Sequence, residues 1–142
     1  MSRMTREECL RFLVDKARTA KIGTVRPDGR PHVAPVWFDL DNDVLVFTTW
    51  TDTVKARNLR NNPAVSICVD DENPPFAYVQ IEGKAEFVDD MSQLLRWATS
   101  IGGKYMGQDA AEAFGKRNAV PGELLVRVSP TRIFGEENIA GW

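Results

Sequence analysis

The part of the chain best equipped for chemistry is residues 49–63, which read TWTDTVKARNLRNNP. Threonine hydroxyls at positions 49, 51 and 53 precede a predicted short helix that ends near Asn61, before Pro63. The first turn of a helix offers unpaired N–H groups and a partial positive charge, so anions bind there. The ammonium of Lys55 can reach the same point, and Arg57 and Arg60 add positive charge further along the helix. This pattern predicts a phosphate-binding site.

A second interpretation of the same residues stays open. A threonine or Asp52 can simply cap the helix, with Lys55, Arg57 and Arg60 solvated on its surface. The chain has neither a Walker pattern nor a GxGxxG pattern, which excludes the usual nucleotide-binding loops. The spacing alone therefore does not decide between a phosphate site and a solvated basic helix.

Few other residues suggest catalysis or metal binding. His32 is the only histidine, so any histidine-based site would have to use it, and we expect it to pack on the surface of a hairpin. Cys9 and Cys68 are far apart and form no CxxC pattern, so we expect reduced thiols and no metal site.

Tryptophans are candidates for stacking on a ring. Trp37 and Trp50 can either stack on a ligand or pack in the core. Trp97 lies in a helical apolar stripe and is expected to pack, whereas Trp142 could close a groove at an interface.

Length and charge set limits on the kind of protein. The chain has 142 residues, which indicates one domain over residues 1–142. It carries 18 basic and 20 acidic residues, and this balance gives no sign of a nucleic-acid partner. No apolar run approaches the roughly 18 residues of a membrane span. The first residues lack the apolar stretch of a secretory signal, so a cytoplasmic location is expected.

Periodicity and turn signals predict the elements that position these residues. A capping box at Thr5 and Glu8 begins a helix, Arg26-Pro27-Asp28-Gly29 turns a hairpin over 21–38, and Gly102-Gly103 ends a helix. Residues 40–43 are predicted to be a turn. The predicted strands are 22–25, 31–38, 44–49, 64–69, 77–88 and 124–128, with 132–134 as a continuation. The predicted helices are 5–18, 91–101, 108–117 and one that is capped by Thr51, Asp52 or Thr53 and runs to about Asn61. Short strands joined by close turns indicate a mainly β barrel or sandwich with flanking helices.

Four motifs occur in an order that resembles the pyridoxamine-phosphate-oxidase-like flavin split-barrel superfamily. They are Asp28-Gly29-Arg30-Pro31, Phe47-Thr48-Thr49, the helix from Thr53 to Pro63, and Glu82-Gly83-Lys84-Ala85. The resemblance covers roughly residues 8–135. It implies a six-stranded antiparallel Greek-key split β-barrel and a homodimer, with a flavin or deazaflavin in a groove at the subunit interface.

The resemblance also implies roles for individual residues. Lys55 would hold the cofactor phosphate with help from Thr49 and Thr53, and Tyr78 would come from the partner subunit. Residues expected to bind the cofactor are Pro35, Val36, Trp37, Thr48, Thr49, Thr53, Lys55, Arg57, Asn58, Arg60 and Tyr78. No catalytic residue is identified, although Tyr78 and His32 are candidates for a proton donor.

The details are most similar to the actinobacterial subgroup that uses coenzyme F420. The second strand, VAPVWF, lacks the Arg-x-x-x-x-Lys pattern of pyridoxamine phosphate oxidases, and Val54 stands where they often carry arginine. The Lys-x-Arg-Asn-Leu-Arg form beginning at Lys55 matches the F420 subgroup. This similarity implies a reductase that transfers hydride from reduced F420 to an electron-poor small molecule, such as an activated alkene or a quinone. The alternatives are an FMN-dependent oxidase or reductase, and a non-catalytic carrier of flavin or deazaflavin.

Overall fold

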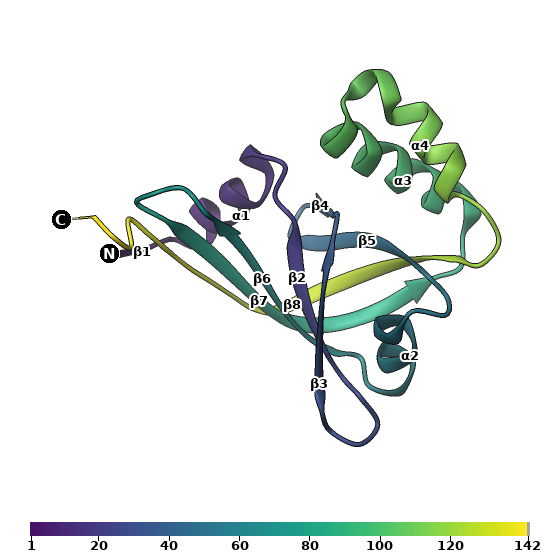
Figure 1. Ribbon diagram of the computed structural model, residues 1–142, viewed down its shortest axis with the longest axis horizontal. Coiled ribbons are helices and arrows are strands. Elements are labelled where there is room, and N and C mark those ends of the chain that lie inside the picture. Colours follow the sequence, from purple (N-terminus) through teal and green to yellow (C-terminus); the bar gives the residue numbers. More distant parts are fainter. Residues whose placement is uncertain (142) are drawn as a thin grey trace.

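A computed structural model describes residues 1–141, so Trp142 and its expected role lie outside the described residues. Within that range the chain forms eight strands, four α-helices and one short 3-10 helix (Figure 1). The strands are β1 (Ser2–Arg3), β2 (Ala20–Val25), β3 (Pro31–Val36), β4 (Asp39–Asp41), β5 (Val44–Trp50), β6 (Ala64–Asp71), β7 (Ala77–Val88) and β8 (Glu123–Glu137). The helices are α1 (Arg6–Asp15), α2 (Val54–Asn61), α3 (Met91–Met106), η1 (Gln108–Ala110) and α4 (Ala111–Asn118). None of these helices combines the length and apolarity needed to cross a membrane.

The strands pair in one antiparallel sheet that forms the predicted split barrel. Their order is β3-β2-β6-β7-β8-β5-β4, and β1 pairs with the end of β8. The path therefore has β3 at one edge and the β5–β4 hairpin at the other. These edges do not pair with each other, and the barrel is split between them. Figure 1 shows α3 and α4 packed together at one end of the sheet and α1 at another.

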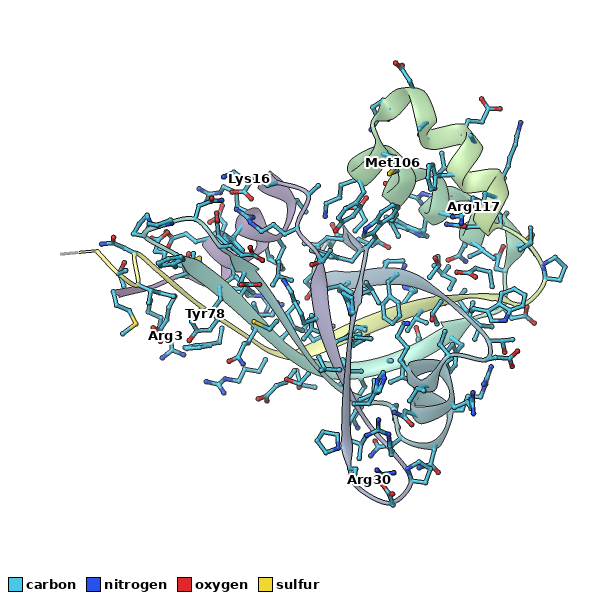
Figure 2. The ribbon with its side chains drawn as sticks, viewed as in Figure 1. Arg3, Lys16, Arg30, Tyr78, Met106 and Arg117 are labelled. Carbon is cyan, nitrogen blue, oxygen red and sulfur yellow. The ribbon has the colours of Figure 1, made fainter. Side chains whose placement is uncertain are left out.

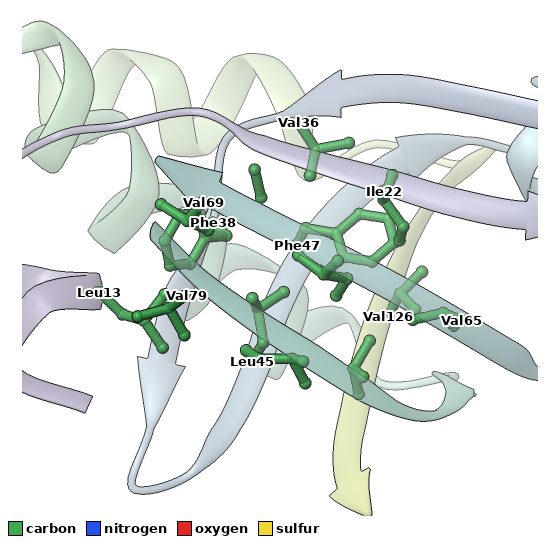
Figure 3. Close-up of a cluster of buried hydrophobic side chains, with 14 of the residues drawn as sticks. Leu13, Ile22, Val36, Phe38, Leu45, Phe47, Val65, Val69, Val79 and Val126 are labelled. Carbon is green, nitrogen blue, oxygen red and sulfur yellow. The ribbon is translucent and has the colours of Figure 1, made fainter. Parts of the chain in front are cut away.

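The core follows from the alternation of apolar side chains along the strands. In a strand, successive side chains point to opposite faces, so every second residue reaches the barrel interior. Ile22, Phe47, Val79 and Val126 are fully buried there, and Leu13 of α1 covers one end (Figure 3). Burying such side chains contributes roughly 1.5–3 kcal/mol each, which makes this cluster the main stabilising feature of the barrel.

The predicted start of the first helix is confirmed. The N–H of Glu8 donates to Thr5 Oγ1 at 3.1 Å, and the N–H of Thr5 donates to Glu8 Oε1 at 2.9 Å, which completes the capping box. The helix ends at Asp15, earlier than predicted, because Lys16 takes an extended conformation. The hairpin over residues 21–38 is also present, as the pairing of β2 with β3.

The prediction that Gly102-Gly103 stops a helix is wrong. Helix α3 continues through both glycines to Met106 and ends at Gly107, whose φ is +95°. A Cβ on Gly102 would lie 2.5 Å from the Cβ of Phe114, so the glycine permits close packing of α3 against α4. Gly102 therefore marks the contact between α3 and α4, and it does not mark the end of a helix.

Two further predictions need correction in detail. Residues 40–43 were predicted to be only a turn, but Asp39–Asp41 pair with β5 as the short strand β4. The six predicted strands are present as the six longer strands, and β1 and β4 are additional. The final strand, β8, is continuous through Pro130 because the register against β7 shifts between Glu82 and Gly83, which accommodates a residue without an N–H.

Candidate functional site

A groove of about 340 Å³ lies across the split of the barrel, between the end of β3 and the end of β5. Helices α3 and α4 supply its third side. The groove is lined by Pro35, Val36, Trp37, Thr48, Thr49, Trp50, Thr53, Lys55, Ile101, Arg117, Asn118 and Glu123. Seven of these residues were predicted from the sequence to bind a cofactor, and the fold brings those seven into one place.

The N-terminus of α2 forms one end of the groove. Thr53 caps this helix, because its Oγ1 accepts the N–H of Ala56 at 3.2 Å. The Thr53 hydroxyl also lies 3.0 Å from the carbonyl oxygen of Trp50 and 2.9 Å from the hydroxyl of Thr49. These bonds fix the helix start in position, so that its first N–H groups and Lys55 lie at the groove.

Charged groups meet at this end of the groove. Burial lowers the pKa of Lys55, and the nearby carboxylate of Glu123 partly offsets this effect. Burial raises the pKa of Glu123, which the Thr48 hydroxyl, Lys55 and Arg117 counteract. The pair is therefore half-buried and electrostatically coupled. An anion entering here meets two cations, Lys55 and Arg117, and one carboxylate.

Glu123 and Arg117 were missed by the sequence analysis. Glu123 begins β8 and lies opposite Trp50 of β5, which places it diagonally across from Thr48. Arg117 lies in the last turn of α4, where it contacts Asn118 Oδ1 at 3.4 Å. Neither residue belongs to a recognisable motif, and only the pairing of β8 with β5 indicates that Glu123 approaches α2.

The opposite side of the groove is aromatic. The ring of Trp37 stacks on Tyr105 of α3, with centroids 5.0 Å apart and an interplanar angle of 2°. The Tyr105 hydroxyl donates to the carbonyl oxygen of Arg18 at 2.6 Å and accepts the N–H of Phe38 at 3.3 Å. Burial raises the pKa of Tyr105 to about 12, so it stays a neutral donor. Trp37 is still 37% exposed, so it borders the groove while α3 fixes its orientation.

Most of the chain matches a known protein family. The model of the family described as "Pyridoxamine 5'-phosphate oxidase" matches residues 6–136. The chain belongs to this family. No match was found among curated protein sequences.

Solved structures of similar proteins have the same fold. A conserved hypothetical protein from Mycobacterium tuberculosis is 27% identical, with 92% of this chain and 82% of that chain covered and a TM-score of 0.79. A protein described as an F420 reductase is 30% identical, with coverage of 87% and 94% and a TM-score of 0.68. An FAD-binding protein from Mycobacterium smegmatis is 26% identical, with coverage of 95% and 98% and a TM-score of 0.66.

Three predicted binding residues of helix α2 do not line the groove. Asn58 is buried, and its Nδ2 donates to Thr24 Oγ1 at 3.0 Å, which joins α2 to β2. The guanidinium of Arg57 donates to the carbonyl oxygen of Asp52 at 2.8 Å. Arg60 donates to the carbonyl oxygen of Thr51 at 3.0 Å and to the Thr51 hydroxyl. Their contacts hold the β5–α2 loop and the helix in place, and Lys55 is the α2 cation that lines the groove.

The two candidate proton donors also lie outside the groove of their own chain. Figure 2 shows Tyr78 near Arg3, at the end of the sheet far from Arg117. The Tyr78 ring lies 5.9 Å from that of Phe134. His32 is half-buried in β3, and its Nδ1 has no hydrogen-bond partner among the described residues. That Tyr78 reaches the groove of a partner subunit stays a prediction.

Trp97 lies in the core, whereas Trp50 lies at the groove. Trp97 is buried and packs against Leu94 and Leu125, as predicted. Trp50 is 46% exposed at the groove and packs over Gly122, where a Cβ would clash with its ring. Gly122 has a φ of +96° and its carbonyl oxygen accepts the N–H of Thr51 at 2.8 Å, so this contact holds the turn before β8 beside the groove.

Proposed function

We propose that the protein is an oxidoreductase that uses coenzyme F420 to reduce an electron-poor small molecule, such as an activated alkene or a quinone. The observation that carries this proposal is the groove across the barrel split. It combines an apolar and aromatic side, formed by Pro35, Val36 and Trp37, with a cationic end at Lys55 and the start of α2. The similarity to a protein described as an F420 reductase supports the choice of cofactor.

The residues of the groove fit the two parts of a deazaflavin nucleotide. A tricyclic ring needs a flat apolar surface, and Trp37, held against Tyr105, offers one. A phosphate needs cations and N–H donors, which Lys55, Arg117 and the first turn of α2 offer at the other end. When bound, the reduced cofactor would supply a hydride, while the protein supplies position and electrostatics.

The chain's own residues would act by binding and orientation. Lys55 would hold the phosphate, and the cap formed by Thr49 and Thr53 would keep the helix start in place. Pro35, Val36 and Trp37 would exclude water from one side of the ring. None of the described residues that line the groove is established as a general acid. The proton that completes the reduction would come from solvent or from a group added by a partner.

We further propose that the protein works as a homodimer. Strand β3 is an edge of the sheet, and Val33 on its outer face is 67% exposed. An unpaired edge with exposed apolar side chains favours association with a second chain. In a two-fold dimer, Tyr78 would contribute to the groove of the other protomer. Replacing Val33 by glutamate should shift the molar mass measured by light scattering from dimer to monomer, whereas a wild-type monomer at micromolar concentration would contradict the dimer.

A titration tests the cofactor assignment. The apo protein is titrated with F420 and with FMN side by side, and oxidation of reduced F420 is then followed by absorbance with a panel of alkenes and quinones. We expect tighter binding of F420 and its turnover with at least one acceptor. Stoichiometric FMN in the purified protein would favour an FMN enzyme, and binding of F420 without any turnover would favour a carrier.

A further inference from the structure

Glu123 is an unusual component of a phosphate-binding groove. The charged side chains that line it, among the described residues, are Lys55, Arg117 and Glu123. With all three ionised, they sum to a net charge of +1 (two cations and one carboxylate). Removing the carboxylate would leave +2. A site built only to attract anions would gain affinity from that removal, so the position of Glu123 needs another explanation.

The position of Glu123 is well defined by the sheet. It pairs across from Trp50 at the end of β5, and Pro121-Gly122 turns the chain immediately before it. Gly122 is held against the Trp50 ring, so the carboxylate enters the groove from a fixed backbone. It acts on Lys55 and Arg117 electrostatically, in a half-buried environment where charges are less screened than in water.

We propose that Glu123 makes this groove selective for a singly charged phosphodiester over a doubly charged phosphomonoester. The inference rests on the proposed function, because it concerns the same cofactor site. A phosphomonoester such as FMN has a second pKa of about 6 and carries close to two negative charges at neutral pH. The phosphate of F420 is a diester without a second ionisable oxygen, so it carries one. Repulsion from Glu123 is therefore about twice as large for the monoester.

Selectivity of this kind works through repulsion of the wrong ligand. The two cations attract both phosphates, while the carboxylate reduces the attraction for each in proportion to ligand charge. Specific sites often use such an unfavourable contact against a competitor. The cost of taking an ion out of water rises with the square of its charge, whereas its attraction to the groove rises only in proportion to the charge. A groove with a net charge of +1 therefore offsets the desolvation of a diester better than that of a monoester.

The test compares Glu123→Gln with the wild type in four binding titrations at pH 8. The ligands are FMN and riboflavin in one series, and in the other the deazaflavin riboside with its phosphate as a methyl diester and the same riboside without phosphate. The ratio of affinities with and without phosphate gives the phosphate contribution in each series. If the substitution strengthens the diester contribution about fivefold, it should strengthen the monoester contribution about 25-fold, because electrostatic energy scales with charge.

Two further variants serve as controls. Glu123→Asp keeps the charge and should keep the wild-type preference for the diester. Glu72→Gln makes the same change in net charge at an exposed site outside the groove, and should leave all four affinities unchanged.

Three outcomes would overturn the inference. Equal changes in the monoester and diester contributions in Glu123→Gln would show that Glu123 does not discriminate by charge, while the proposed function stands. Equal changes with the phosphate-free ligands would show that Glu123 acts on the ring. If the wild type binds FMN in preference to F420, both the inference and the proposed function are wrong.

Discussion

Replacing Lys55 by methionine would test the proposed phosphate site most directly. Methionine keeps most of the aliphatic stem of lysine and removes the ammonium, so packing against the start of α2 changes little. In the structure Lys55 is half-buried in the groove, and burial lowers its pKa because desolvation disfavours the charged form. The ammonium is therefore costly to keep in place, and this cost is consistent with a role in binding an anion.

The magnitude follows from the bond that is lost. A hydrogen bond to a charged group contributes roughly 1.5–3 kcal/mol, which corresponds to a loss of about ten- to 150-fold in affinity for F420. The affinity for the phosphate-free deazaflavin riboside should change less than about twofold, because that ligand has no group for Lys55 to bind. Isothermal titration calorimetry with both ligands would measure the two losses separately.

Thermal stability distinguishes a binding role from a structural one. Lys55→Met relieves the desolvation of an ammonium but leaves Glu123 with less compensation, so we expect the melting temperature to change little. Arg60→Met is the matched control: its guanidinium holds Thr51, so this variant should melt lower and retain cofactor affinity. The opposite pattern, with unchanged affinity and a lowered melting temperature in Lys55→Met, would refute a phosphate site at Lys55.

Three other changes test the scaffold around the groove. Tyr105→Phe leaves the N–H of Phe38 without its acceptor and should lower stability by about 1–2 kcal/mol in urea unfolding; no loss would mean that this hydroxyl does not hold the aromatic side of the groove. Gly102→Ala places a methyl group against α4 and should lower the free energy of unfolding by about 1–3 kcal/mol. An unfolding midpoint equal to that of the wild type would indicate that α3 and α4 can move apart to make room for the methyl group. The pKa of Asp71 is lowered to about 2 by the backbone and side-chain N–H groups of Asn73 and by an Arg18 guanidinium. Because the folded-state pKa lies below the ordinary 3.8, the stability from Asp71 is present above about pH 4 and is lost as the pH falls through about 2. The stability difference between wild type and Asp71→Asn should therefore shrink over that range, and a constant difference would contradict the assigned contacts.

Features that depend on near neighbours in the chain could be predicted from the sequence alone. These features are the capping box at Thr5 and Glu8, the hairpin turn at residues 26–29, the bounds of β7 and a cap of α2 within residues 51–53, and each involves residues a few positions apart. Their geometry is set by local backbone preferences and by side-chain periodicity. The ordered motifs also indicated the family and the split barrel, which the family match confirmed.

Features that depend on distant contacts could not be predicted in this way. Gly102 was predicted to stop a helix because the residues next to it in the sequence do not show that Phe114, on another helix, packs against it. Asn58 and Arg60 look like binding residues in the motif, yet one is buried against β2 and the other holds a loop.

The same limit applies to the groove. Lys55 was recognisable from its place at the start of a helix, whereas Arg117 and Glu123 reach the groove only because β8 pairs with β5 and α4 packs on α3. Strand register and helix packing are decided by the fit of whole surfaces. The local sequence could therefore suggest where an anion binds, but only the tertiary structure decided which other charges it meets there.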